Sequence, residues 1–161
     1  RDQITEILLT LRIVNEILQV WFGSPDWGNQ PHLIDELVFI QLARRSKIED
    51  AIRHLAAIHD EFDDWSAVAD ARPEDLRVVI KGGGLEARKV EYIQGALNGI
   101  RERFGRIEED DLALMSNEEL DVFLQRLPGI GPKSSACVLM YVRDVDVFPA
   151  EGVASERGQS R

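Results

Sequence analysis

Apolar residues recur at steps of three and four along most of the chain, and this spacing restricts the fold more than any other feature. It is typical of helices that bury one face. The pattern covers residues 33–42, 47–59 and 88–100 and is longest near the start of the chain, at Ile4, Ile7, Leu8, Leu11, Val14, Ile17, Leu18 and Trp21. Only residues 145–148 alternate as a strand would, and that run is short. The sequence therefore predicts an all-α fold, a helical bundle without a repeat.

Local signals mark where several of these helices begin and end. Pro73 suits the first turn of a helix, and Ser116 with Glu119 three positions later has the pattern of a capping box. Glycines 82–84 are expected to end the helix that Pro73 opens, and residues 23–26 to stop the first helix.

The charge of the chain limits how it can bind nucleic acid. The formal net charge is −10 at pH 7, whereas proteins that coat nucleic acid without specificity rely on many Lys and Arg side chains. A DNA-binding chain of this composition must concentrate positive charge locally. Arg126, Lys133 and Arg143 do lie in one short stretch.

Several features indicate the compartment. No apolar stretch approaches the roughly 20 residues that span a bilayer, and the chain does not start with the apolar block of a secretory signal. Cys137 is the single cysteine, so no disulfide can form within the chain, which fits a reducing compartment. We therefore expect a soluble, intracellular, cytoplasmic protein that makes no membrane contact. His54 and His59 do not share a helical face, so we expect no metal site there.

The most informative stretch is LPGIGPKSSACV at residues 127–138. Its two glycines allow a tight turn between two helices, Ile130 can fill the groove between them, and Pro132 suits the first turn of the second helix. Such a turn presents backbone N–H groups at a helix N-terminus, where a DNA phosphate can bind without many basic side chains. The residues expected to contact DNA here are Leu127, Gly129, Ile130, Gly131, Lys133 and Ser134.

This stretch resembles the helix-hairpin-helix motif, and residues 1 to about 150 are similar to the endonuclease III branch of the DNA glycosylases. The wider resemblance rests on Asp35-Glu36-Leu37-Val38, on residues 65–70, on Gly83-Gly84-Leu85 with Lys89, and on Val147-Phe148-Pro149. It implies a bifunctional DNA glycosylase and abasic-site lyase of base-excision repair. Its implied partner is duplex DNA that contains an oxidised pyrimidine or an abasic site.

The resemblance also assigns a nucleophile, because the family uses a lysine at the position of Lys133. A lysine amine in apolar surroundings loses its proton readily, attacks the sugar C1′ of a flipped-out nucleotide and forms a Schiff base that permits strand cleavage. The alternative is that Lys133 is an exposed residue that only touches phosphate, as in hairpins without an enzymatic role.

The sequence departs from the family after Ala150. The family places an essential aspartate where this chain has Glu151. One extra methylene moves the carboxylate by about 1 Å, and a displacement of that size can cost on the order of 100-fold in rate. Residues 152–161 lack the apolar period of the family's next helix, so we expect residues 151–161 to form an unstructured tail and the core to be incomplete at its C-terminal side.

The same departure affects the cofactor and the domain organisation. Four cysteines that follow this point hold a 4Fe–4S cluster in the family, and this sequence has one cysteine, so we expect no cofactor and no metal. The resemblance assigns residues 1–22 to the family's second domain and residues 33–150 to the helix-hairpin-helix core. A first helix without its partners would expose an apolar face, so we expect a monomer that tends to self-associate.

A basic turn at Arg44, Arg45 and Lys47 is the third departure. Relatives commonly have Ser-Gln-(any)-Thr here, and that Gln enters the gap left by the flipped base. Arg44 occupies the Gln position. The three cations can grip the DNA backbone, fill the gap, or form an ordinary solvated turn.

Two functions remain open. In the first, the chain is an enzyme in which Lys133 is the nucleophile and Glu151 replaces the aspartate. In the second, it is a non-catalytic helix-hairpin-helix module that binds DNA and has a decayed active site, as the abrupt change after Ala150 suggests. A third and less supported function is an adaptor for protein partners, for which only the acidic surface argues.

Overall fold

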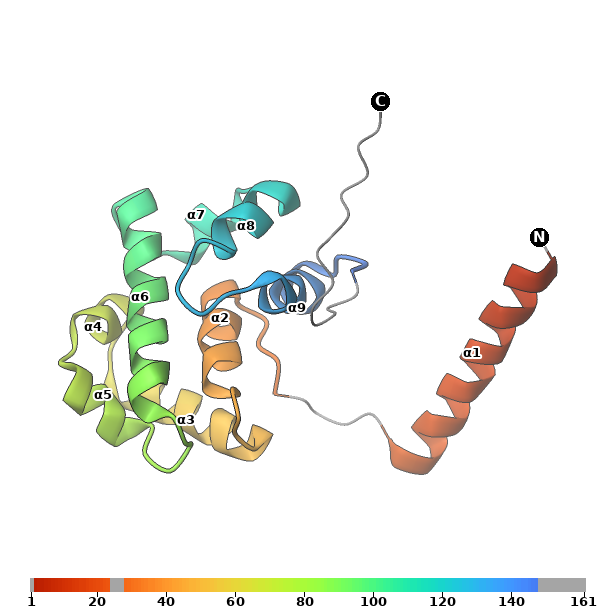
Figure 1. Ribbon diagram of the computed structural model, residues 1–161, viewed down its shortest axis with the longest axis horizontal. Coiled ribbons are helices and arrows are strands. Elements are labelled where there is room, and N and C mark those ends of the chain that lie inside the picture. Colours follow the sequence, from red (N-terminus) through yellow and green to blue (C-terminus); the bar gives the residue numbers. More distant parts are fainter. Residues whose placement is uncertain (1, 24–27, 148–161) are drawn as a thin grey trace.

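The computed structural model describes residues 2–23 and 28–147, and these form helices joined by short loops (Figure 1). No strand occurs in either described range, so the predicted all-α class is confirmed. The helices are α1 (Asp2–Phe22), α2 (Leu33–Leu42), α3 (Ile48–Glu61), α4 (Trp65–Asp70), α5 (Pro73–Val79), α6 (Glu86–Phe104), α7 (Glu109–Ala113), α8 (Asn117–Leu124) and α9 (Pro132–Arg143).

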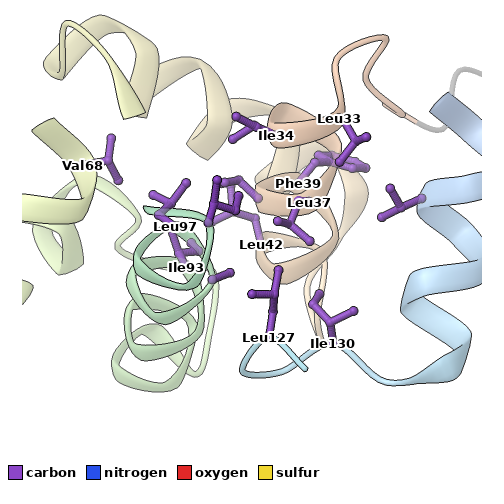
Figure 2. Close-up of a cluster of buried hydrophobic side chains, with 14 of the residues drawn as sticks. Leu33, Ile34, Leu37, Phe39, Leu42, Val68, Ile93, Leu97, Leu127 and Ile130 are labelled. Atoms are coloured by element: carbon purple, nitrogen blue, oxygen red, sulfur yellow. The ribbon is translucent and has the colours of Figure 1, made fainter. Parts of the chain in front are cut away.

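Helix α2 forms the centre of the bundle, because it is apolar on nearly all sides. It packs against α3, α6, α7 and α9. Its side chains at Leu33, Ile34, Leu37, Val38, Phe39 and Leu42 are each at most 2% exposed. Figure 2 shows α2 between α6 and α9, with Leu127 and Ile130 pointing toward it from the loop that precedes α9. The core therefore joins segments that lie about 90 residues apart in sequence.

The predicted helix starts are confirmed, and the structure adds one that the sequence concealed. Ser116 and Glu119 form the capping box in both directions, at 3.2 and 3.0 Å. His32, before α2, provides no side-chain cap. Glu109 caps α2 instead, by accepting from the backbone N–H groups of Leu33 at 2.6 Å and Ile34 at 3.1 Å. A carboxylate at a helix N-terminus is favoured by the helix dipole, so this contact joins the start of α7 to the core helix.

Helix α1 is present as predicted, and its apolar face is uncovered, which agrees with the expectation for a first helix without its partners. It stands apart from the other helices in Figure 1. Its large apolar side chains are all exposed, from 45% at Val14 to 84% at Val20. The cause is that no described element covers the stripe which the three- and four-residue spacing creates.

Among residues 2–23 and 28–147, no helix is both long enough and apolar enough to cross a bilayer. Two of the predicted features lie outside the described residues. They are the tail at 151–161, which includes Glu151, and part of the helix stop at 23–26.

Candidate nucleic-acid interface

Residues 125–131 make the predicted tight connection between α8 and α9. Gly129 has a φ of +77°, a left-handed conformation that glycine adopts without steric cost. The N–H of Ile130 donates to the carbonyl of Leu127 at 3.1 Å, and the Ile130 side chain is buried. Pro132 is in the first turn of α9, as predicted. We call residues 125–131 the hairpin.

The two glycines of the hairpin serve different purposes. At Gly129 a Cβ would lie 2.6 Å from Cγ of Tyr92 and 3.0 Å from Oε1 of Gln41, so the fold itself requires glycine. At Gly131 the φ is −100° and a Cβ would meet nothing within 4 Å. The fold would accept a side chain at Gly131, and the space in front of it is open. This is the space that a close backbone ligand would need.

The hairpin is held against α6 by two glycines that the sequence analysis overlooked. A Cβ at Gly95 would lie 2.9 Å from Cγ of Pro128, and a Cβ at Gly99 would lie 2.5 Å from Cδ2 of Leu127. Because glycines four residues apart share a helical face, the pair gives α6 a flat surface on which the hairpin rests. Their spacing in the sequence was the signal that could have revealed this contact.

Lys133 is the second residue of α9 and its side chain is exposed. The apolar surroundings expected for a nucleophilic amine are therefore not found around it in the described structure. The amides of a first helical turn point out of the N-terminal end of the helix, and the start of α9 lies next to the open space at Gly131. Ser134 follows, half-buried.

The start of α9 is fixed by a buried serine. The Oγ of Ser135, which is 0% exposed, donates to Oδ1 of Asp121 on α8 at 2.7 Å. The Nε2 of Gln125 donates to the same oxygen at 2.7 Å. These bonds set the position of α9, and with it Lys133, relative to α8 and the hairpin.

Helix α2, which packs against α9, carries a buried carboxyl group. Glu36 is 0% exposed and accepts from Nδ2 of Asn29 and from the backbone N–H of Gln30, both at 2.7 Å. Burial raises the pKa of Glu36, and these two hydrogen bonds oppose that effect. On α9, burial raises the pKa of the Cys137 thiol; the charge of Lys133 lowers it and that of Glu36 raises it. The sequence analysis assigned no role to Glu36 beyond its place in the family helix.

Of the three cations in the basic turn, Arg44 is the one that lies near the hairpin, through a shared contact with Tyr92. Arg44 is half-buried, and its guanidinium carbon lies 5.2 Å from the ring centre of Tyr92 on α6, the ring that also contacts Gly129. Arg45 is exposed and has a φ of +48°, and Lys47 is exposed directly before α3. No described contact brings Arg45 or Lys47 to the hairpin.

A buried lysine holds this basic turn in place. Lys89 on α6 is 1% exposed, and its Nζ donates to the carbonyl of Gly83 at 2.8 Å and to Oγ of Ser46. Ser46 Oγ in turn donates to the carbonyl of Gly83. Burial lowers the pKa of Lys89. The family-like residues Gly83 and Lys89 thus connect the basic turn to the glycine turn before α6.

The family's iron–sulfur cluster does not fit the residues present. Such a cluster is held by four thiolates in the family, and this chain has Cys137 alone. Among residues 2–23 and 28–147, no group of three or more His, Cys, Asp or Glu side chains could hold a metal ion. Glu151, the second predicted catalytic residue, is outside those ranges.

Comparisons with known proteins find one relative in sequence and several structures of similar fold. No protein-family model matches the chain. A curated Arabidopsis thaliana protein, provisionally named a DNA glycosylase, is 30% identical over 119 residues, which are 74% of this chain and 41% of that protein. A non-covalent endonuclease III–DNA complex has a TM-score of 0.68 at 14% identity over 90% of this chain and 64% of its own. The 3-methyladenine DNA glycosylase MagIII of H. pylori has a TM-score of 0.67 at 19% identity over 91% and 67%.

The fold is therefore that of the helix-hairpin-helix DNA glycosylases. The chain is thus similar in sequence to a protein provisionally named a DNA glycosylase, and similar in fold to endonuclease III. It spans less than half the length of its curated Arabidopsis relative.

Proposed function

We propose that this chain binds duplex DNA through the hairpin and acts on it as a DNA glycosylase of base-excision repair. The observation that carries the proposal is Gly131, which the fold does not require to be glycine. A side chain there would occupy the open space in front of the first turn of α9. Glycine leaves room for a phosphate to approach the backbone at a helix N-terminus, a favourable place for an anion.

The proposed chemistry uses Lys133, two residues beyond Gly131. Its neutral amine attacks C1′ of a nucleotide that has left the base stack, a bond forms between Nζ and C1′, and the glycosidic bond breaks. The departing base takes up the proton that the amine loses. The sugar ring then opens: the C1′–O4′ bond breaks, O4′ takes up a proton, and a protonated Schiff base remains between Nζ and C1′. Abstraction of the adjacent C2′ proton then expels the 3′ phosphate by β-elimination. Glu151 is the carboxylate proposed to activate the amine, and oxidised pyrimidines are the proposed substrates.

Borohydride trapping on a duplex that contains one abasic site tests this proposal. Borohydride reduces a Schiff base to a stable amine, so the wild-type chain should form a covalent adduct of protein and DNA. Lys133→Ala should abolish the adduct, and Glu151→Gln should weaken it. A matched duplex without the abasic site is the control.

The alternative function predicts a different result. If the chain binds the abasic duplex and no adduct forms, the lyase mechanism is wrong and the protein is a hairpin module that binds DNA without this chemistry. An adduct that persists in Lys133→Ala would equally contradict the assignment of Lys133.

A further inference from the structure

Tyr92 lies at the point where the hairpin, α6 and the basic turn meet. Its ring is so close to Gly129 that a Cβ there would lie 2.6 Å from Cγ of Tyr92. The guanidinium carbon of Arg44 lies over the same ring, 5.2 Å from its centre. One half-buried aromatic side chain is therefore close to both the hairpin and a cation of the basic turn.

A second guanidinium converges on the same ring. Arg88, one turn before Tyr92 on α6, lies 5.7 Å from the ring centre, and its Nη1 donates to the Tyr92 hydroxyl at 3.2 Å. Arg88 also lies 3.7 Å from Glu91, but both side chains are well exposed, at 62% and 69%, so water screens this pair strongly. Within residues 2–23 and 28–147, no carboxylate pairs with Arg44.

Two positive charges gathered on one ring, in a chain of net charge −10, repel each other in the unbound protein. A bound anion relieves that repulsion. The cation–π contacts reduce the freedom of both long side chains before an anion arrives, so less entropy is lost on binding. Because Tyr92 lies beside Gly129, such an anion would be close to the ligand that the hairpin binds.

We propose that Arg44, Arg88 and Tyr92 form a second phosphate-binding site, which holds the backbone of the same DNA duplex that the hairpin binds. The two arginines contact phosphate, and Tyr92 is the positioning residue that keeps them beside the hairpin. This inference rests on the proposed function, because it assumes that the hairpin faces DNA. It extends the interface onto α6, where the sequence analysis placed no binding residue.

The salt dependence of duplex binding tests the site, with fluorescence anisotropy as the readout. Each phosphate contact contributes a slope of about −0.9 to the plot of log affinity against log salt concentration. Arg44→Gln and Arg88→Gln should each make the slope less steep by roughly that amount, and should weaken binding roughly tenfold at 0.1 M salt. Tyr92→Leu should also flatten the slope although it removes no charge, which a purely structural role would not do.

The matched control is Arg103→Gln. Arg103 is on the same helix and lies 5.8 Å from the ring centre of Phe104, so it loses the same charge from a similar cation–π pair. It is fifteen residues from Arg88, about 22 Å along α6. Its slope should equal that of the wild type. If Arg44→Gln and Arg88→Gln give the slope of Arg103→Gln, the second site is refuted.

Two further variants keep the result interpretable. If Tyr92→Leu does not fold, Tyr92→Phe replaces it: this variant keeps the ring and removes the acceptor for Arg88, so it should weaken binding less than Arg88→Gln. Gly131→Thr tests the hairpin by itself. If Gly131→Thr weakens binding and the arginine variants do not, the second site is wrong and the proposed function stands. If none of them alters DNA binding, the proposed function also fails.

Discussion

Gln41 on the core helix α2 donates from Nε2 to the carbonyl oxygen of Pro128 in the hairpin, at 3.3 Å. Gln41 is 0% exposed, and its Oε1 has no hydrogen-bond partner within the described part of the chain. One amide therefore joins the hairpin to the centre of the bundle while leaving a buried acceptor unsatisfied. The hairpin is attached to the core on two sides, by this bond to α2 and by the glycine face of α6.

Two substitutions of Gln41 should change the stability of the protein by different amounts. Gln41→Met removes one weak hydrogen bond together with a buried unsatisfied oxygen, so the free energy of unfolding should change by no more than about 1 kcal/mol. Gln41→Glu places a carboxylate against the Pro128 carbonyl in a buried site and should cost about 3 kcal/mol or more. Urea unfolding of both variants at pH 7 measures the difference. Equal stability of the two would contradict the hydrogen bond to Pro128.

Substitutions at the two glycines of the hairpin should have different effects, one on stability and the other on DNA binding. Gly129→Ala forces a left-handed residue with a Cβ onto the Tyr92 ring and should destabilise the protein by about 2 kcal/mol. Gly131→Thr should change stability by less than about 0.5 kcal/mol, because Thr and Gly are similar as N-cap residues. Thermal unfolding measures both values.

The effect of Gly131→Thr on DNA affinity completes this comparison. Its side chain fills the space in front of α9, so duplex affinity should fall by at least roughly tenfold while the fold persists. Unchanged affinity in a stably folded Gly131→Thr variant would mean that DNA does not approach the hairpin at this residue.

The buried carboxyl of Glu36 should make stability depend on pH. Folding raises the pKa of Glu36 above its ordinary value of 4.5, chiefly by burial, so the folded state binds this proton more tightly than the unfolded state. The resulting stabilisation is complete below pH 4.5 and is lost as the pH rises through the folded pKa. Glu36→Gln lacks this titration. Relative to the wild type, the variant should therefore gain stability between pH 4 and pH 7.

Chemical denaturation across that pH range measures the free energy of unfolding of both proteins. The contributions of the other titrating groups are nearly the same in the two proteins and largely cancel in the comparison. Lys133→Ala is a useful companion variant, since its substitution should leave the pH trend in place. The stability of Glu36→Gln minus that of the wild type should rise with pH. A value that stays constant, or that falls as the pH rises, would contradict the raised pKa of Glu36.

The exposed apolar side chains of α1 should cause self-association at high protein concentration. Sedimentation velocity should show the wild type moving from monomer to larger species as its concentration rises. The triple variant Leu8→Ser, Leu11→Ser and Leu18→Ser should shift this transition to higher concentration, because these three side chains are 48–61% exposed. A wild-type chain that stays a compact monomer at all concentrations would refute the prediction.

The sequence by itself determined the helices and the hairpin, because these depend on local rules. The spacing of apolar residues locates the helices, Ser116 and Glu119 cap α8, and Gly129 with Pro132 makes the turn into α9. Each of these signals acts over a few residues, where backbone geometry and nearby hydrogen bonds decide the outcome.

Tertiary structure alone decided which distant residues meet. Glu109 caps a helix 76 residues earlier, Gln41 reaches Pro128 across 87 residues, and Tyr92 brings Arg44 to Gly129. The apolar spacing of α1 indicates a face that can be buried, but it does not identify the element that would cover it. Such contacts depend on how the helices pack against one another, and the spacing of apolar residues within a helix does not determine that packing.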